Sequence, residues 1–492
     1  MKHLHVGALV AVAALVATAP LVFAGGTPHS TGGAALPPPV GLHLSRNRDA
    51  EPGIAVDGGG TLWIAGDVNP NETTDPRSSG IVLTGADVWK STNGGRSYVY
   101  AGSPFSTAER NNPGAAGEDT DMAAAPVKDS SGHYRAYVAS LWLGATSVAT
   151  TTDGGASWSV NPLGGVPAQD RPFIAASGPC TVYLLYHQLP SFTPFVNTYD
   201  LCTLSNNNAG AVIPAVSQAQ VLADQASGNV FNKLVVDNSP YSQYKGSVYV
   251  PLQICSSGGN PKTLVTDTAT SCAAEKMVLA VSRDGARTFA EYPIASSTTA
   301  GTPVWGATVA TDATGRVYYT WADKSAAWVS VSSDGGAHWS RAIRVSTGPA
   351  HTAVYPTVAA GAPGQVAVAW YGTTLYSAKG SDDRAVMGPP GVPGGAVWRV
   401  WMAESRDGGR TWREDEMTGP IHLGQVCTGG SSCLGNGDRN LYDDFGVVLL
   451  HGSNLAAIAY SADLPGGKST DTFTGYVTER CRLGSAACSA RL

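Results

Sequence analysis

Residues 405–412 read Ser-Arg-Asp-Gly-Gly-Arg-Thr-Trp, and four close copies of this octapeptide occur elsewhere in the chain. The copies are Ser-Thr-Asn-Gly-Gly-Arg-Ser-Tyr at 91–98, Thr-Thr-Asp-Gly-Gly-Ala-Ser-Trp at 151–158, Ser-Arg-Asp-Gly-Ala-Arg-Thr-Phe at 282–289 and Ser-Ser-Asp-Gly-Gly-Ala-His-Trp at 332–339. In each copy the Asp or Asn side chain can accept backbone N–H groups across a turn, and glycine can adopt the positive φ that the turn requires. We therefore expect five hairpin turns, called box turns below, each with an aromatic ring packed against the next structural unit.

The segments around these motifs predict a repeated antiparallel sheet. In the first unit, apolar strands at 53–57, 61–68 and 87–92 are separated by turns, and a fourth strand begins at Tyr98. Similar first strands begin near Met122, Phe173, Lys233, Thr308, Thr357 and Phe445, and in the third unit the strands are expected at 173–177, 181–187 and 198–203. Repeated four-stranded meanders indicate an all-β fold, a β-propeller of seven blades, with six blades as the alternative count. Two separate β-sandwiches are the alternative fold, but sandwiches do not normally repeat one turn motif every four strands.

The ends of the repeat indicate how the ring closes. The seventh unit runs out after a third strand at 475–480, and the segment 40–44 can supply its missing fourth strand. Closure of this kind limits the number of exposed strand edges. We therefore expect one propeller domain at residues 40–492.

The N-terminal residues have the pattern of an export signal. Basic and imidazole side chains precede an apolar run at 6–21, and Val-Phe-Ala at 22–24 resembles a cleavage site. We expect a signal peptide at 1–24, a flexible leader rich in Gly, Pro and Thr at 25–39, and a secreted monomer with no membrane span after cleavage. A retained membrane anchor is the alternative, although the apolar run is marginally short for a span.

All eight cysteines lie after the predicted signal peptide, and an even number in an exported chain indicates disulfides. Pairing in sequence order closes four local loops: Cys180–Cys202, Cys255–Cys272, Cys427–Cys433 and Cys481–Cys488. A zinc site is the weaker interpretation because no Cys-x-x-Cys pair occurs. The first and last of these loops lie in the two units that lack a box turn, so a disulfide can replace the lost hydrogen bonds of the turn.

Strand alternation assigns the connecting segments to two faces. The box turns and the first turn of each unit share one face, called the box face below. The residues that precede each first strand lie on the opposite face, called the entrance face. The long insertions at 69–86, 255–275, 373–396 and 421–440 also fall there. Function is expected where variable loops decorate a rigid scaffold.

Charged residues are scarce in this chain, at 14%, yet they gather at the unit entrances. These polar residues are Arg48, Asp49, Glu51, Glu118, Asp119, Asp121, Asp170, Arg171, Arg439, Tyr442 and Asp443. Carboxylate pairs with Arg and Tyr supply the groups that glycoside chemistry requires. Taken singly, each acid can instead bond the backbone of a neighbouring unit and hold two blades together. The net charge of −6 argues against a nucleic-acid partner.

The five box turns resemble the Asp-box (BNR) repeats of the sialidase-like propeller superfamily. Sialidases of that family hold a substrate carboxylate with three arginines, and they use a Tyr–Glu nucleophile pair and an Asp acid/base. Their first arginine lies in an Arg-Ile-Pro motif ahead of the first inner strand. Here the equivalent stretch, 47–52, reads Asn-Arg-Asp-Ala-Glu-Pro, so Arg48 or Arg46 would take the place of that arginine.

The resemblance implies a sialidase-like glycoside hydrolase that acts on a carbohydrate or glycoconjugate at the mouth of the central channel. Asp49 or Asp121 would be the acid/base, and Glu51 or Glu118 would assist Tyr442. Arg48, Arg171 and Arg439 would hold an anionic group, with Asp170 and Asp443 beside them. The alternatives are a non-catalytic propeller that binds a glycan or protein, and a structural propeller braced by Ca²⁺ at Glu118, Asp119 and Asp121. No other cofactor is expected.

Overall fold

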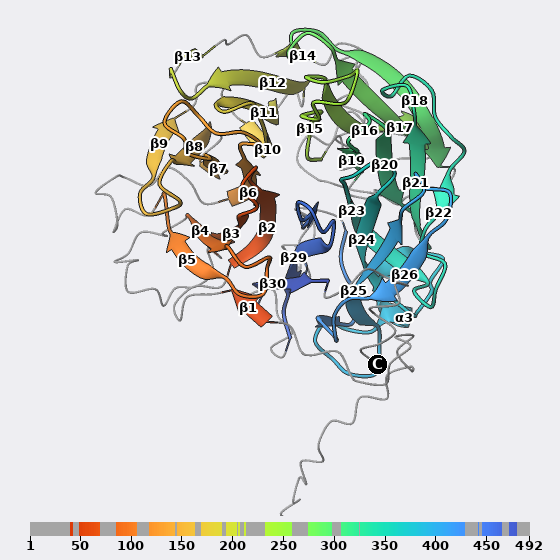
Figure 1. Cartoon of the computed structure of the whole chain (residues 1–492). Coiled ribbons are helices and arrows are strands. Elements are labelled where there is room, and N and C mark those ends of the chain that lie inside the picture. Colours follow the sequence, from red (N-terminus) through yellow and green to blue (C-terminus); the bar gives the residue numbers. More distant parts are fainter. Residues whose placement is uncertain are drawn as a thin grey trace, which may run out of the picture.

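A computed structural model describes residues 40–42, 49–68, 85–105, 118–142, 145–162, 169–188, 193–203, 205–206, 211–212, 232–257, 274–297, 307–323, 325–428, 441, 445–464 and 472–479. The strands form seven antiparallel sheets arranged around a common axis (Figure 1). This arrangement confirms the all-β propeller with seven blades. The predicted signal peptide and leader lie outside the described residues. No helix in the described part of the chain has the length and apolar character needed to cross a membrane.

Each blade is a meander in which consecutive strands pair. Blade 1 contains β2 (Asp49–Val56), β3 (Leu62–Val68), β4 (Ala86–Ser91) and β5 (Val99–Gly102). Blade 2 contains β6 (Glu118–Ala124), β7 (Ala136–Trp142), β8 (Ala145–Thr151) and β9 (Ser159–Pro162). Blade 3 contains β10 (Gln169–Ser177), β11 (Thr181–Gln188), β12 (Thr193–Asp200), β13 (Ser205–Asn206) and β14 (Ala211–Val212). Blade 4 contains β15 (Val235–Val236), β16 (Val248–Ser257), β17 (Ala274–Ser282) and β18 (Ala290–Ser297).

The remaining blades follow the same order. Blade 5 contains β19 (Thr308–Thr311), β20 (Val317–Ala322), β21 (Ala327–Ser332) and β22 (Ile343–Arg344). Blade 6 contains β23 (Thr352–Ala360), β24 (Val366–Thr373), β25 (Val397–Ser405), β26 (Arg413–Glu416) and β27 (His422–Leu423), with the 3-10 helix η1 (Gly380–Asp382) and helix α3 (Arg384–Met387) inserted before β25. Blade 7 contains β28 (Gly446–Leu449), β29 (Ala456–Ala462), β30 (Phe473–Thr478) and β1 (Val40–Leu42).

Strand β1 closes the ring as expected. It pairs antiparallel with β30, with Val40 opposite Tyr476 and Leu42 opposite Thr474. The first and the last described strands of the chain therefore share one sheet. Their backbone hydrogen bonds hold the ring closed, so the fourth strand of blade 7 comes from the other end of the domain.

The box turns have the hydrogen bonds that the sequence predicts. In the copy of blade 6, the Ser405 hydroxyl lies 2.9 Å from Asp407 and accepts the Gly409 N–H at 2.9 Å. Asp407 also accepts the backbone N–H of Thr411 at 2.9 Å and its hydroxyl at 2.6 Å. The other four copies repeat the first two contacts and the bond to the backbone N–H. The turn is thus fixed by its own side chains.

The aromatic ring of a box turn packs on the preceding blade, not on the next unit as expected. Trp158 of blade 2 meets Trp63 of blade 1 edge-on at 6.2 Å and donates its indole N–H to the Ala101 carbonyl at 2.8 Å. Tyr98 of blade 1 likewise meets Tyr476 of blade 7 at 4.6 Å. The reason is that the box turn of a blade leans over the blade before it. Each ring therefore closes the blade interface on that side.

Four inner strands begin earlier than expected. The strands β2, β6, β10 and β23 start at Asp49, Glu118, Gln169 and Thr352, because pairing continues through a β-bulge near the entrance end. A bulge leaves a residue unpaired without ending the strand. In blade 3 the third strand also starts earlier, at Thr193, because it pairs with the whole length of β11. The entrance residues are therefore parts of the sheets and not loop residues.

One predicted disulfide is confirmed in full. Cys180 and Cys202 are bonded and join the first turn of blade 3 to the end of its third strand, where this blade lacks a box turn. Cys427 is also disulfide-bonded. The side chain of Cys255 and the residues Cys272, Cys433, Cys481 and Cys488 lie outside the described part of the chain.

Candidate functional site

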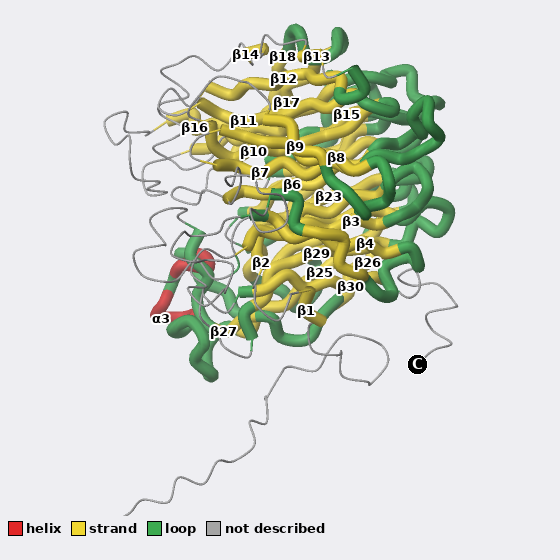
Figure 2. The backbone as a smooth tube through the Cα atoms, turned by 90° about the vertical axis from the view of Figure 1, so that its left-hand side faces the viewer, coloured by secondary structure: helices red, strands yellow, loops and turns green. Residues whose placement is uncertain are grey.

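The box turns and the entrance residues lie at opposite ends of the blades. In blade 6 the first turn contacts the box turn, because the Gly408 N–H donates to the Gly364 carbonyl at 3.0 Å. In blade 3, Asp170 lies opposite His187, at the end of β10 away from the first turn at Ser177. Seen from the side, α3 and β27 lie at one edge of the stacked strands and most described loops lie at the other (Figure 2). The two predicted faces are therefore present.

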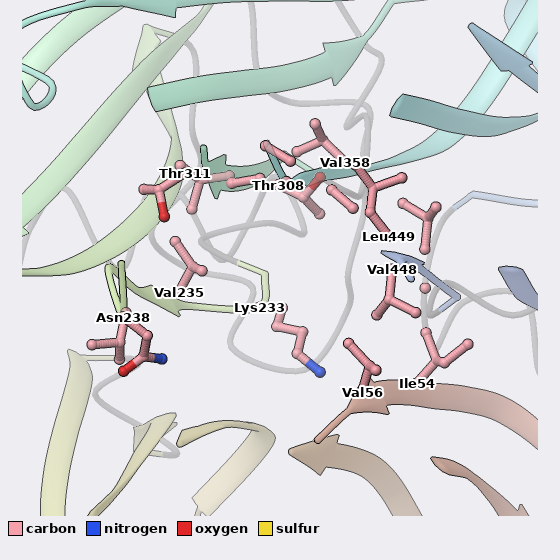
Figure 3. Close-up of a pocket in the computed structure, with 18 of the residues that line it drawn as sticks. Ile54, Val56, Lys233, Val235, Asn238, Thr308, Thr311, Val358, Val448 and Leu449 are labelled. Atoms are coloured by element: carbon pink, nitrogen blue, oxygen red, sulfur yellow. The ribbon is translucent and has the colours of Figure 1, made fainter. Parts of the chain in front are cut away.

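A cavity of about 750 Å³ runs between the inner strands of all seven blades. Its wall is mainly aliphatic, and Figure 3 shows Ile54, Val56, Val235, Val358 and Val448 around it. The side chain of Lys233 reaches in among these residues. An aliphatic wall with a few polar groups is a common form of binding site. At the entrance end the charged residues of the wall are Asp121 and Lys233, and first-turn residues of the box face, such as Pro240 and Asn454, line the opposite end.

Asp121 lies in the wall of this channel and joins three blades. It is buried, and it accepts the backbone N–H of Ile174 in blade 3 at 2.9 Å. Its other oxygen lies 2.6 Å from the Lys233 ammonium group, which also donates to the Met122 carbonyl at 2.7 Å. Both carboxylate oxygens are therefore engaged by neighbouring blades. This is the blade-joining geometry that the sequence analysis allowed for a single entrance acid.

Two carboxyl groups converge at the junction of blades 2 and 3. The backbone N–H of Arg171 lies 3.2 Å from an oxygen of Asp119 and 3.1 Å from an oxygen of Asp170. The second oxygen of Asp170 lies 3.1 Å from Nε2 of His187. The Asp170 side chain is 36% exposed, whereas that of His187 is 6% exposed. The pair therefore opens to solvent on one side and rests on a buried imidazole on the other.

The surroundings of Asp170 favour its ionised form. Burial alone raises the pKa of this carboxyl group, but the hydrogen bond and charge of His187 and the charge of Arg171 outweigh it. The pKa of Asp170 is therefore lowered from its usual value. At neutral pH this member of the pair carries a negative charge.

The entrance ends of four inner strands have an unusual backbone. Glu51, Asp119, Arg171 and Tyr355 have φ values of 48°, 42°, 54° and 52°, the left-handed region that favours glycine. Each lies at the β-bulge of its strand, three residues before a buried aliphatic residue or methionine. Non-glycine residues in this conformation cost about 1–3 kcal/mol each and cluster at functional sites. The bulges therefore distinguish the entrance ends of these four strands from their opposite ends.

The side chains of Glu51 and Tyr355 are buried at this face. The N–H of Glu51 donates to the Ser461 hydroxyl of blade 7 at 3.3 Å. The Tyr355 hydroxyl donates to the Cys427 carbonyl at 3.4 Å, and its ring meets Tyr371 edge-on at 6.2 Å. Glu51 thus contacts the preceding blade in the ring, and Tyr355 contacts the connection to the following blade.

An insertion before β25 stands on the entrance face beside blades 6 and 7. Asp382 accepts the backbone N–H of Thr428 at 3.0 Å and its hydroxyl at 2.7 Å. The fully buried His422 lies with Nδ1 2.7 Å from Asp463 and Nε2 2.9 Å from the Gln425 carbonyl. The contacts of Asp382 hold the insertion to the segment after β27, and the contact of His422 with Asp463 joins β27 to blade 7.

The structure brings together only part of the predicted site. Asp170 and Arg171 meet at the blade 2–blade 3 junction, Glu51 lies in blade 1, and Asp121 lies in the channel wall. Arg48, Arg439, Tyr442 and Asp443 lie outside the described residues, as do the side chains of Asp49 and Glu118. The sequence does not indicate His187 except through its position opposite Asp170 in the second strand, and it predicts no catalytic role for Asp119.

Among the described side chains, one group has the spacing of metal ligands, and it lies in blade 3 rather than at the proposed Ca²⁺ site. It consists of Cys180, Asp200 and Cys202, and its two cysteines are joined in the disulfide. At the proposed Ca²⁺ site, Asp121 already faces Lys233, and Asp119 faces the N–H of Arg171. These two acids therefore point to different partners.

No protein-family model matches the chain, and no curated protein matches it. Solved structures resemble it at low identity. An α-L-arabinofuranosidase from Fusarium graminearum is 11% identical over 91% of this chain and 98% of that chain, with a TM-score of 0.47. A xyloglucanase from Xanthomonas campestris is 14% identical over 87% of this chain and 53% of that chain, with a TM-score of 0.44. An intramolecular trans-sialidase from Ruminococcus gnavus is 10% identical over 90% of this chain and 96% of that chain, with a TM-score of 0.41.

Proposed function

We propose that this protein is a secreted, carbohydrate-active enzyme that hydrolyses a glycosidic bond at the entrance face. The observation that carries the proposal is the convergence of Asp119 and Asp170 on one backbone N–H, with His187 behind them. Glycoside hydrolysis needs a carboxyl group that can give a proton to the leaving oxygen. Two carboxyl groups in unequal surroundings are the usual way to keep such a proton available near neutral pH.

The sialidase-like specificity is the finer part of the proposal. Arg171 places a guanidinium group directly after Asp170, where it can hold an anionic group of the substrate. Arg48 and Arg439 would complete the set of three arginines, with Asp443 beside them. Tyr442, assisted by Glu51 or Glu118, would be the nucleophile, and Asp49 or Asp121 is the acid/base that the family resemblance implies. The signal-peptide pattern at residues 1–24 supports secretion.

A panel of fluorogenic glycosides tests the activity. The panel contains an α-sialoside, neutral pyranosides and furanosides, and each is tested with the wild-type protein, Asp170→Asn and Asp407→Asn. We expect turnover of at least one glycoside and a loss of about 10²–10⁴-fold in kcat/KM for Asp170→Asn. Asp407→Asn is the matched control because the same substitution is then made on the opposite face. Failure of the wild-type protein to turn over any glycoside would remove the proposal.

A non-catalytic glycan-binding propeller is the second candidate. The contacts of Asp121 favour it, because they show that an entrance acid can serve to join blades rather than to react. A glycan array probed with the wild-type protein and with Arg171→Ala separates the two functions. Binding that depends on Arg171, without hydrolysis of the bound glycan, would establish the binding module instead of the enzyme.

A further inference from the structure

We propose that the central channel is a second binding site, which takes a neutral, unbranched aliphatic molecule that ends in a hydrogen-bond-accepting oxygen. The oxygen lies at the entrance end, beside Asn232 and Lys233, and the aliphatic chain runs along the channel toward the box face. The site is distinct from the carboxyl groups at the junction of blades 2 and 3. Binding in the channel goes beyond the proposed function and does not depend on it.

The middle of the channel is aliphatic and has room for a ligand. Its volume of about 750 Å³ falls within the usual range for small-molecule sites, about 300–1,000 Å³. Val56, Val235 and Val448 belong to inner strands and yet are only half-buried, because their side chains face the channel (Figure 3). Water beside such a wall finds few hydrogen-bonding partners, so its displacement by an aliphatic chain is favourable.

Lys233 supplies one hydrogen-bond donor at the entrance end. An ammonium group has three N–H donors. Within the described part of the chain, two of them are used, by Asp121 at 2.6 Å and by the Met122 carbonyl at 2.7 Å. The Lys233 side chain is still 34% exposed, and it reaches into the channel (Figure 3). Its third N–H is therefore available to a ligand.

Asn232 supplies a second donor next to it. Its side chain lines the channel, and the residue is only 8% exposed. Its Oδ1 accepts the backbone N–H of Lys233 at 2.6 Å, which identifies the other terminal atom of the amide as the nitrogen. No described residue accepts a hydrogen bond from that nitrogen. A nearly buried amide is costly in this state unless a water or a ligand oxygen accepts its N–H groups.

The charges at the entrance end favour a neutral head group. Asp121 and Lys233 compensate each other, and Asp121 also accepts the Ile174 N–H at 2.9 Å. Lys233 is the only lysine or arginine among the described residues that line the channel. A carboxylate ligand would add a second negative charge near Asp121 without a second cation, and a buried, uncompensated charge is disfavoured. A hydroxyl or carbonyl oxygen can accept both N–H groups without adding charge.

The length of the aliphatic wall sets the length of the chain. Between its β-bulge and its first turn, the inner strand β2 continues from Gly53 to Val56. Four residues span about 13 Å at a rise of about 3.3 Å per residue. An extended chain advances about 1.1–1.2 Å per bond, so roughly ten to twelve carbon atoms fill this distance.

The box-face end of the channel offers an apolar entry. Val127 and Tyr241 line the channel there and are 48% and 84% exposed. Pro240, which also lines the channel, is exposed as well. Exposed apolar side chains at the mouth of an aliphatic channel are typical of a ligand-binding site. The apolar end of the ligand therefore lies toward the box face, and its oxygen lies toward Lys233.

A chain-length series tests the site directly. Equilibrium dialysis with quantification by gas chromatography measures the binding of primary alcohols of six to fourteen carbons to the wild-type protein. We expect the affinity to rise about fourfold with each added carbon, up to about ten to twelve carbons, and then to level off. At neutral pH, 1-decanol should bind at least about tenfold more tightly than decanoate.

Three outcomes of this series would overturn the proposal. The first is that no alcohol binds. The second is that decanoate binds as tightly as 1-decanol, because the site would then hold an anion. The third is an affinity that rises without levelling off, because that dependence indicates adsorption to an exposed surface and not a channel of fixed length.

A matched pair of variants assigns the binding to the channel. Val448→Phe adds a ring to the channel wall and should weaken the binding of 1-decanol by at least about tenfold. Val99→Phe is the control, because the same substitution is made at a residue that is 58% exposed on the outer strand β5, and the affinity should not change. Chemical denaturation checks that both variants fold. Wild-type affinity in folded Val448→Phe, or an equal loss in Val99→Phe, would overturn the proposal.

The oxygen-binding end is tested with Asn232→Ala and two ligands of the same length. The variant should bind 1-octanol about 3- to 10-fold more weakly than the wild-type protein does, because one hydrogen bond is lost. Its affinity for octane, which has no oxygen, should stay the same. An equal loss for both ligands, or no loss for 1-octanol, would show that Asn232 does not hold the oxygen. None of these measurements involves turnover, so they decide the channel site whether or not the protein hydrolyses a glycoside.

Discussion

The box face and the entrance face both depend on left-handed backbone, but different residues adopt it. In the box turns these positions are glycines: Gly94, Gly95, Gly154, Gly155, Gly285, Gly335, Gly336, Gly408 and Gly409, with Ala286 as the exception at φ 65°. At the entrance they are Glu51, Asp119, Arg171 and Tyr355. Glycine adopts this conformation without steric cost, whereas another residue loses about 1–2 kcal/mol. The box face is therefore built for stability, and the entrance face gives up stability to place particular side chains.

The contacts between blades differ in the same way. On the box face a cation of one blade donates to a box-turn carbonyl of the next, as Lys90 does to Gly154 and Arg283 does to Gly335. At the entrance the inter-blade contacts vary: the carboxylate of Asp121 accepts the Ile174 N–H, whereas the N–H of Glu51 donates to the Ser461 hydroxyl. On the box face, the repeated box sequence is accompanied by repeated contacts between blades. Variation between equivalent positions indicates where function has replaced repetition.

The largest expected effect is on the box face. Trp158→Ala removes a ring that fills the interface with Trp63 and leaves the Ala101 carbonyl without the indole N–H. We expect the free energy of unfolding to fall by about 3–5 kcal/mol, while kcat/KM of the folded fraction stays unchanged. Chemical denaturation and the glycoside assay measure the two quantities. A large loss of activity in correctly folded Trp158→Ala would break the separation of the two faces.

Blade 3 extends the comparison to a blade without a box turn, because a disulfide lies where the box turn would be. The bond between Cys180 and Cys202 closes a loop with a sequence separation of 22 residues. Replacing both cysteines by serine should lower the free energy of unfolding by about 2–4 kcal/mol. The measurement is denaturation of the double variant beside the wild-type protein under oxidising and reducing conditions. If reduction destabilises the double variant as much as the wild type, then this disulfide is not the source of the effect.

The sequence predicted the architecture because the box turn has a strong local signal. A hydroxyl residue, an Asx residue and glycines at fixed offsets specify one turn, and the turn sets the strand register on both sides. The register, in turn, placed the segment 40–44 in the last blade, and β1 lies there. The direction in which Trp158 packs was wrong, because the lean of the turn depends on the twist of the whole blade.

The site was only partly predictable because its backbone lacks that signal. Left-handed backbone is usually indicated by glycine, and Asp119 gives no such indication. A weak signal existed in Glu51-Pro52 and Arg171-Pro172, since proline inside a strand indicates a break in pairing. His187 could be found only from the register that sets it opposite Asp170. Side-chain direction at a bulge therefore has to come from coordinates.

A smaller effect concerns the charge of the box turns. Asp407 is exposed, and the hydroxyl and backbone N–H of Thr411 lower its pKa to about 2. The pKa of Asp407 in the unfolded chain is about 3.9, so the stabilisation is complete above that pH and is lost as the pH falls toward 2. Asp407→Ala should lower the free energy of unfolding by about 1–2 kcal/mol at pH 7 and by less at pH 2. Denaturation at both pH values measures this, and an equal loss at both would show that the charge of Asp407 does not contribute.

The smallest expected effect concerns the left-handed backbone of the entrance face. It is measured by comparing the stability of a glycine variant and an alanine variant at the same position. At an ordinary strand position a variant with glycine is less stable than a variant with alanine, because glycine gives the unfolded chain more conformations. At Arg171 the order should reverse, so Arg171→Gly should be about 1 kcal/mol more stable than Arg171→Ala, since glycine tolerates the φ of 54°. Both variants lack the guanidinium group, and both should therefore lose the ability to hold an anionic substrate. On the box face, Ala286→Gly should relieve the same strain at φ 65° without any change in kcat/KM. If alanine is as stable as glycine at Arg171, the entrance backbone is not strained, and the two faces differ in their side chains alone.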